Sequence, residues 1–430
     1  MKFKILLVLT FICFNLFSQN PVPGTKQTNP IALIGGTIHV GNGKIIENGT
    51  ILFENGIIQA VGDNSVVIPA NTEKISVIGK SIYPSIIAPN AQAGLQEISS
   101  LRSSNDMAET GSMNPNVRAM VAFNTDSEVI PTIRGNGILI GQVTPDGGIL
   151  SGTSAVMEYD GWNWEDAVLK KDDGLWVYWP TYFERSFDSE DFKFKTKKND
   201  KRLEQIRDLT QFFSEAKSYF SIAKPENINL KFEALRGLFN ETKTLYVRAD
   251  YGKDIFEAVR FSQDLGIKKL VIVGAEQAEL VLDLLKTNQI PVIVSPTHRL
   301  PATNDEDVWK PYKLPATLKN AGIQTGLYYS EDFWKTRNLP FVAGTAAAFG
   351  LTSEEALEMI TLTNAKILGV QTILGSLEVG KHATIVVSKG DILDMKTNTV
   401  EMAFVRGRKI DLDDKQKRLN KKFSDKFGIK

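Results

Sequence analysis

LYVRADYGKDIFEAVRFSQDLGIKKLVIV, residues 245–273, holds a complete unit of alternating secondary structure. Leu245–Ala249 and Leu270–Val273 are the short aliphatic runs that buried strands need. Between them, apolar side chains recur at helical spacing over residues 254–265, and Gly266 stands where a helix would end. A strand, a helix and a second strand in so short a stretch indicate parallel β/α architecture, because a parallel connection needs a crossover segment.

The same alternation continues on both sides of this unit. Downstream, the pattern predicts a helix over 277–287, a strand over 292–294, a helix near 316–320 and a strand over 323–328, and upstream it predicts an amphipathic helix over 203–216. Thr352 with Glu355 has the spacing of a capping box, which predicts a further helix from there to Leu368. Strands between residues 117 and 143 are harder to count. We therefore predict an α/β fold with a distorted TIM (β/α)8 barrel over residues 85–368. Strand counting alone leaves an open sheet as the alternative.

Both ends of the chain are rich in short β-prone runs. Residues 31–84 carry several such runs, separated by Asn42-Gly43, Asn48-Gly49 and Asn55-Gly56, which are dipeptides that accept the positive φ of hairpin turns. Similar short β-prone runs recur over residues 369–412. Neither part has enough strands to be stable alone, so we predict that the two pair into one composite β-sandwich. The densely charged residues 413–430 predict a solvated helix or a frayed end.

The first eighteen residues have the pattern of a secretory signal peptide. Two lysines precede an apolar run, and the small Ser18 offers a cleavage position before a linker over residues 19–30. We therefore expect an exported protein, periplasmic or secreted. The run is too short to span a bilayer, and no later segment comes near the required length. The single cysteine, Cys13, lies in this segment, so the mature chain cannot contain a disulfide within itself.

Composition narrows the classes of partner and of metal site. The chain has 50 basic and 50 acidic side chains, which argues against nucleic acid or an anionic membrane as an obligatory partner. A hydrophobic content of 42% excludes a disordered chain. With three histidines in total, a four-histidine metal cluster cannot be made.

Short motifs occur along the whole chain. They are LIGGT (33–37), IIQAVG (57–62), IYP (82–84), NPNVRA (114–119), GILSGTSA (148–155), GWNW (161–164), RNLPF (337–341), ILGV (367–370) and GSLEVGK (375–381). Together these motifs resemble those of the amidohydrolase superfamily, in its imidazolonepropionase-like and dihydroorotase-like branch, and some are similar to those of exported members. The resemblance covers nearly the whole mature chain. It implies a distorted TIM barrel with a composite β-sandwich, and a metal-dependent hydrolase of carbon–nitrogen bonds.

The resemblance also exposes a departure at the metal-ligand positions. Family members follow the first barrel strand with His-x-His, whereas this chain has Asn90 and Gln92 there. The fifth-strand histidine is replaced by Arg248. Amide oxygens are weak ligands for zinc, and a guanidinium is the reverse of a ligand. We therefore predict a degenerate site with no metal and no cofactor, with zinc as the alternative if the site is rebuilt in an unexpected way.

Other candidates for the site are fewer and less specific. The resemblance places a vestigial catalytic acid at Asp332 or Glu331 and the sixth-strand position near Glu276. His298 follows the predicted strand 292–294 at the correct rim, where a lone imidazole more often fixes a loop than binds a ligand. Trp162 and Trp164 belong to a stretch rich in aromatic residues. Such residues could line a ligand pocket, or could equally be anchors in the core or at an interface.

Two hypotheses for the function follow. We favour a catalytically inactive binding or assembly subunit that partners an active paralogue retaining His-x-His, because a fold alone does not guarantee activity. The aromatic run from Trp162 to Trp179 and the cluster of Phe333, Trp334 and Arg337 are the predicted partner anchors. The alternative is a hydrolase of cyclic amides or other non-peptide carbon–nitrogen bonds with a non-standard or metal-free site.

Overall fold

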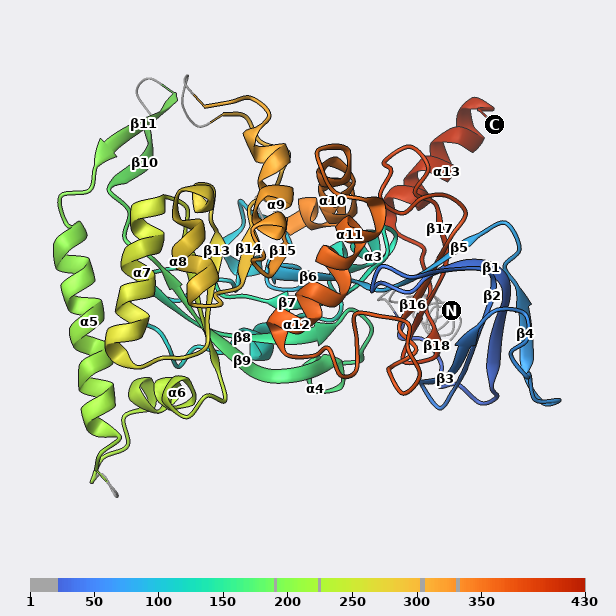
Figure 1. Cartoon of the computed structure of the whole chain (residues 1–430), viewed down its shortest axis with the longest axis horizontal. Helices are drawn as coiled ribbons and strands as arrows, with labels where there is room; N and C mark the ends of the chain where they lie inside the picture. The colour runs from blue at the N-terminus through green and yellow to red at the C-terminus, as the bar shows by residue number, and fades with distance from the viewer. Residues whose placement is uncertain (1–21, 189–191, 223–225, 302–305, 330–332, 430) are drawn as a thin grey trace, which may run out of the picture.

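The computed structural model describes residues 22–188, 192–222, 226–301, 306–329 and 333–429 (Figure 1). The predicted signal peptide lies outside these residues, as do the two acids predicted at the last barrel strand, Glu331 and Asp332. Two large sheets organise the chain. One forms a nearly closed barrel in the centre of Figure 1, and the other lies beside it, next to the last helix of the chain.

The barrel sheet has eight strands in the order β15-β14-β13-β12-β9-β8-β7-β6. This arrangement confirms the predicted α/β class and the distorted TIM-type barrel. The predicted strands at 245–249, 270–273 and 292–294 are present within a residue, and the last strand is shorter than predicted. The strand bounds are β6 (Ile86–Ala91), β7 (Ile138–Val143), β8 (Leu150–Glu158), β9 (Val168–Tyr178), β12 (Thr244–Ala249), β13 (Leu270–Gly274), β14 (Val292–Val294) and β15 (Thr325–Leu327).

The reversal of β8 is the first distortion of the barrel. This strand pairs antiparallel with both β7 and β9, whereas the other neighbours in the sheet are parallel. Residues 144–149, which connect β7 to β8, are too few for the crossover that a parallel pair needs. The end of β8 therefore lies at the opposite end of the barrel from the ends of β7 and β9.

The second distortion is a gap between β6 and β15, which do not pair in the sheet. Asn364, which is fully buried, spans this gap with its side-chain amide. Its Nδ2 donates to the carbonyl oxygen of Ile87 on β6 at 2.9 Å and to that of Leu327 on β15 at 3.0 Å. A Cβ on Gly326 would lie 2.1 Å from Asn364 Oδ1, so the close approach requires glycine there. The side chain of Asn364 thus connects β6 and β15 in place of direct strand pairing.

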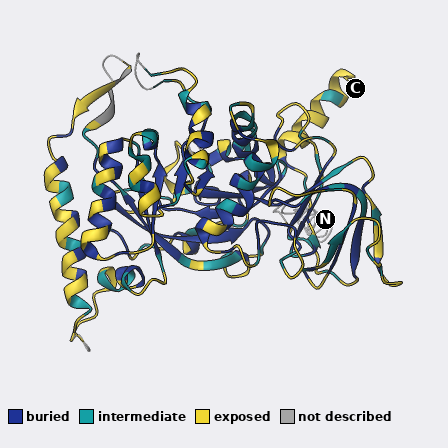
Figure 2. Ribbon diagram, in the orientation of Figure 1, coloured by how far each residue is buried: buried dark blue, intermediate teal, exposed yellow. Residues whose placement is uncertain are grey.

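Helices cover the outside of the barrel (Figures 1 and 2). Gly266 ends α7 in the left-handed conformation, and Thr352 with Glu355 forms a capping box, both as the sequence predicts. The helix predicted over 277–287 begins as a 3-10 turn. The bounds are α2 (Ala119–Ala122), α3 (Val129–Arg134), α4 (Trp164–Ala167), α5 (Arg202–Tyr219), α6 (Leu230–Phe239), α7 (Gly252–Leu265), α8 (Leu282–Thr287), α9 (Lys310–Asn320), α10 (Leu339–Ala348), α11 (Ser353–Glu358), α12 (Asn364–Leu368) and α13 (Lys415–Phe427), with 3-10 turns η2 (Arg102–Ser104), η3 (Ala278–Val281) and η4 (Phe333–Asn338) and a π-helical turn η5 (Met359–Thr363).

The second sheet joins the two ends of the chain. Its order is β18-β17-β16-β5-β1-β2-β3, with β4 paired to β1, and β5 meets β16 antiparallel with Pro84 opposite Ile385. The predicted sandwich is therefore a single hydrogen-bonded sheet among the described residues. Asn55-Gly56 forms a hairpin turn as predicted, whereas Asn48-Gly49 lies inside β2. The bounds are β1 (Ile31–His39), β2 (Ile45–Glu54), β3 (Ile57–Gly62), β4 (Glu73–Ser76), β5 (Ser81–Pro84), β16 (Ile385–Ser388), β17 (Val400–Val405) and β18 (Arg408–Lys409).

Two further elements lie outside both sheets. A hairpin of β10 (Phe183–Asp188) and β11 (Lys193–Lys198) precedes α5. The charged tail forms the helix α13, in agreement with the prediction of a solvated helix. No helix in the described part of the chain is long and apolar enough to cross a membrane.

Candidate functional site at the barrel mouth

The ends of the parallel strands define the mouth of the barrel, which is where barrels of this kind carry their chemistry. Arg248 lies near the end of β12, in register with Tyr178 on β9. Its guanidinium carbon is 5.9 Å from the centre of the Tyr178 ring, and its Nε is 3.9 Å from Oδ2 of Asp250. The side chains of Arg248 and Asp250 are 37% and 28% exposed, so solvent reaches both.

The electrostatics of the mouth keep Arg248 cationic. Its acidic neighbours, Tyr328 first and then Asp250, hold the pKa of Arg248 above its usual value against the opposing effect of burial. Burial raises the pKa of Asp250, and the positive charges of Arg248 and Arg299 act in the opposite direction. The mouth therefore combines a fixed positive charge with a carboxyl group whose proton affinity depends on that charge.

A second carboxylate, Asp146, lies next to this pair. Gln92 donates from Nε2 to Oδ2 of Asp146 at 3.1 Å. The side-chain amide that the resemblance placed at a metal-ligand position is therefore engaged in a hydrogen bond to a carboxylate. Burial, and then the negative charge of Asp146, raise the pKa of Tyr178. Sequence reasoning missed Asp146, Asp250 and Tyr178 as members of the mouth. For Asp250 a signal was available, because it directly follows a barrel strand.

Asn90, the other predicted ligand position, is buried at 1% exposure in the left-handed conformation with φ +50°. Its backbone N–H donates to Oε1 of Gln142 at 3.2 Å. Gln142 in turn belongs to a fully buried polar network around Asp173, whose carboxylate accepts hydrogen bonds from three side chains: Gln142 Nε2 (2.9 Å), Ser154 Oγ (2.7 Å) and Tyr246 OH (3.0 Å). Burial raises the pKa of Asp173. The sequence analysis did not identify this network.

Glu276 and His298 do not join Arg248 in one cluster of contacts. Glu276 forms an ion pair of 3.5 Å with Arg299, which also pairs with Glu306 at 2.8 Å. Nε2 of His298 is hydrogen-bonded to Oγ1 of Thr345 on α10 at 2.6 Å. Burial lowers the pKa of His298, which favours the neutral imidazole. These contacts give His298 a loop-fixing position.

Trp162 and Trp164 lie at the other end of the barrel. They follow β8, and the reversal of that strand carries the β8–β9 connection away from the mouth. Trp162 is 68% exposed, and the backbone carbonyl of Trp162 accepts a hydrogen bond from Thr125 Oγ1 at 3.1 Å. These tryptophans therefore lie away from Arg248 at the mouth.

The residues described at the mouth do not fit a catalytic zinc ion. Asn90 offers only a neutral amide oxygen, Gln92 supplies an amide whose N–H is held by Asp146, and Arg248 places a guanidinium, which has donors and no acceptor, at the strand end. Within the described ranges, no group of three or more His, Cys, Asp and Glu side chains is placed to hold a metal ion. We derive no reaction step through a metal.

Comparison with known proteins agrees with the fold. Residues 314–410 match the family model described as the amidohydrolase family, and no curated protein sequence matches the chain. An amidohydrolase from Thermotoga maritima MSB8 is similar with a TM-score of 0.78 and 22% identity, covering 89% of this chain and 99% of that one. A prolidase complexed with N-methylphosphonate-L-proline has a TM-score of 0.56 and 15% identity over 89% and 99%. A zinc-bound adenosine deaminase from Xanthomonas campestris has a TM-score of 0.53 and 13% identity over 95% and 99%.

Residues 314–410 match the amidohydrolase family model and the fold agrees with it, which supports the predicted resemblance to the amidohydrolase superfamily. At identities below 25%, the likeness to the solved structures concerns the fold and not the chemistry at the mouth.

Proposed function

We propose that this chain is an exported, catalytically inactive member of the amidohydrolase superfamily that acts as a binding or assembly subunit beside an active paralogue. One observation carries the proposal. Arg248 places a charged guanidinium at the barrel mouth, where the resemblance puts a metal-binding histidine, and Asp250 lies beside it. A cation in that position opposes a second cation, so the mouth favours anionic or polar ligands over a metal ion.

The surroundings of Arg248 support a retained role for the mouth. Its charge is balanced by Asp250 and Asp146, and Gln92 is oriented by its hydrogen bond to Asp146. Random mutation after a loss of function would not be expected to keep Asp250, Asp146 and Gln92 matched to Arg248 in this way.

The proposed partner surface is narrower than the sequence suggested. Trp176 and Trp179 are buried inside the chain, and Phe333 is 3% exposed, so these three are core residues and not partner anchors. Trp162 stays exposed on the connection between β8 and β9. We assign the paralogue contact to the face around Trp162, away from the mouth.

A carbon–nitrogen hydrolase remains the second candidate, and one observation favours it. Asp250 lies at a strand end with a raised pKa, which is a property of general acids and bases. The similar prolidase and deaminase are named for such reactions. Among the described residues at the mouth, Asp250 and Asp146 are the carboxylates that could activate water in a metal-free hydrolysis.

Affinity purification from the native exported fraction tests the proposed role. We expect the tagged chain to recover a second amidohydrolase-fold protein that contains His-x-His. Trp162→Asp should reduce recovery at least about tenfold, because a central aromatic anchor is worth more than about 1.4 kcal/mol. Leu203→Asp, at a site that is 78% exposed on α5, is the matched control and should leave recovery unchanged.

Two outcomes would overturn the proposal. One is recovery of the protein alone, with the hydrolase activity of the fraction unchanged when the gene is deleted. The other is turnover of cyclic amides by the purified chain that is abolished by Asp250→Asn, which would establish the second candidate instead.

A further inference from the structure

The helix α13 extends from the body of the protein beside the second sheet (Figures 1 and 2). None of its residues is buried. Its first turn is nevertheless fixed in place, because Asp414 caps the helix by accepting from the backbone N–H of Lys417 at 2.9 Å. Oγ1 of Thr132 on α3 donates to Oε1 of Gln416 at 2.8 Å. The helix is thus held at one end and presents the rest of its surface to solvent.

An apolar stripe runs along this exposed surface. Leu419, Phe423 and Phe427 are spaced four residues apart, which places them on one face of the helix. They are 42%, 48% and 64% exposed. Two phenylalanines and a leucine aligned on a solvated helix therefore keep much of their apolar surface in contact with water. An aligned exposed apolar face of this kind marks an interaction surface.

Basic side chains flank the stripe. Lys415, Lys421, Lys422 and Lys426 form no ion pair with any other described residue. With Lys417 and Arg418 they make six basic residues on the helix, against the single acid Asp425. Nζ of Lys422 lies 6.0 Å from the centre of the Phe423 ring, and Nζ of Lys426 lies 5.1 Å from that of Phe427. The chain is neutral overall, so α13 is a local concentration of positive charge.

We propose that α13 docks on an anionic phospholipid surface, with Leu419, Phe423 and Phe427 inserted at the level of the acyl chains. An interfacial helix has these properties: a narrow apolar face, a Lys-rich polar face and low overall hydrophobicity. Lysine side chains beside the apolar stripe are long enough to reach the lipid phosphates while their stems cover apolar surface. The anchored first turn gives the docked protein a defined orientation relative to the membrane.

Co-sedimentation of the full mature chain with lipid vesicles tests this proposal. We expect binding to phosphatidylcholine vesicles containing about 30% phosphatidylglycerol to be at least about tenfold tighter than to phosphatidylcholine alone, and to weaken at high salt. Two triple variants should each lower binding at least about tenfold, by removing the apolar or the charged contribution. They are Leu419→Ser with Phe423→Ser and Phe427→Ser, and Lys421→Gln with Lys422→Gln and Lys426→Gln.

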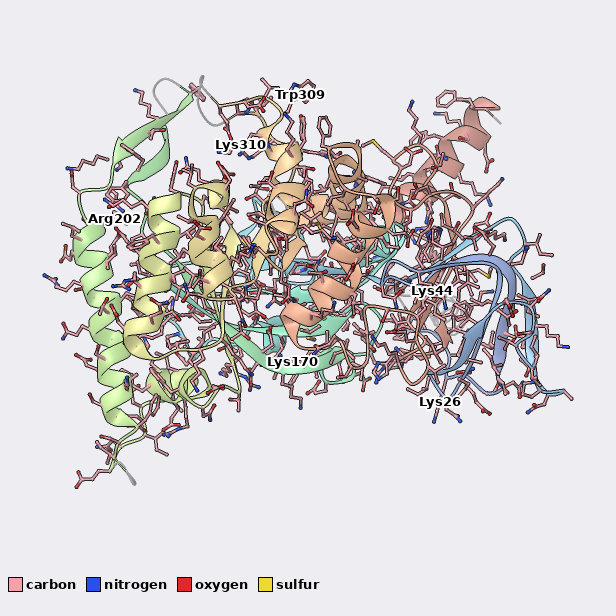
Figure 3. The ribbon with its side chains drawn as sticks, in the orientation of Figure 1. Lys26, Lys44, Lys170, Arg202, Trp309 and Lys310 are labelled. Atoms are coloured by element: carbon pink, nitrogen blue, oxygen red, sulfur yellow. The ribbon has the colours of Figure 1, made fainter. Side chains whose placement is uncertain are left out.

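Matched substitutions elsewhere on the surface control for general changes in charge and polarity. Lys26 and Lys44, both labelled in Figure 3, and Lys389 are exposed lysines outside α13. Leu203, Ile228 and Leu230 are exposed apolar residues outside α13. Changing either set to Gln or Ser should leave vesicle binding within about twofold of the unmodified protein.

Circular dichroism shows whether each variant keeps its fold. Absence of binding to the anionic vesicles would overturn the proposal, as would binding that both α13 variants retain. So would a dimer in sedimentation velocity that the apolar variant dissociates, because the stripe would then be covered by a second copy of the chain.

Discussion

Asn364 closes the barrel, and replacing it by leucine should destabilise the protein strongly. Leucine keeps the volume of the side chain and removes both N–H donors. The carbonyl oxygens of Ile87 and Leu327 would then lose hydrogen bonds of 2.9 and 3.0 Å at a site with no solvent exposure. Each buried polar group left without a partner costs about 1–3 kcal/mol, so we expect a loss of about 2–6 kcal/mol in the free energy of unfolding.

Thr361→Val provides the matched control in the same helical segment. Thr361 is also fully buried, and its hydroxyl donates at 2.7 Å to the carbonyl of Leu357 within its own helical segment, bridging no strands. Its loss should cost less than about 1.5 kcal/mol, because this carbonyl belongs to a helix and the bond is a local one. Urea unfolding followed by tryptophan fluorescence compares the two variants. If Asn364→Leu is no more destabilising than Thr361→Val, the side-chain bridge does not hold β6 to β15.

Three further predictions concern single sites. Arg248→Met should raise the pKa of Asp250, because the guanidinium lowers it; carboxyl-carbon NMR titration measures this, and an unchanged pKa would mean that the two groups do not interact. Thr352→Ala should lower the unfolding free energy by about 1 kcal/mol through loss of the capping box, whereas a change below about 0.3 kcal/mol would show the cap to be dispensable. Asp173 has a raised native pKa, so its stabilising contribution is present below its unfolded pKa and is lost as pH rises through the native value. The unmodified protein should therefore lose stability relative to Asp173→Asn as pH rises above the unfolded value of about 4, and parallel pH profiles would contradict this.

The parts of the fold that sequence predicted are those set by local chemistry. Helical spacing and the positive φ available to Gly266 defined α7, and Thr352 with Glu355 defined the start of α11. We predicted that the two ends of the chain pair because neither has enough strands to be stable alone. The antiparallel pair of β5 and β16 joins them.

The remaining features depend on strand direction and on contacts distant in sequence. The reversal of β8, which places Trp162 away from the mouth, could not be predicted because a strand's residue pattern does not encode its direction. The three hydrogen-bond partners of Asp173 lie on three other strands, so no local spacing in the sequence indicates that they meet. Asn364 was indistinguishable in sequence from an ordinary polar residue of a helix.

The metal content of the purified mature protein tests the central claim most directly. The account predicts far less than one equivalent of zinc, iron or manganese after dialysis, because Asn90, Gln92 and Arg248 supply neither imidazole nor carboxylate. Elemental analysis should show the same low content for Asn90→Ala. About one equivalent of metal that survives dialysis and is lost in Asn90→Ala would contradict the account and restore a metal-dependent hydrolase.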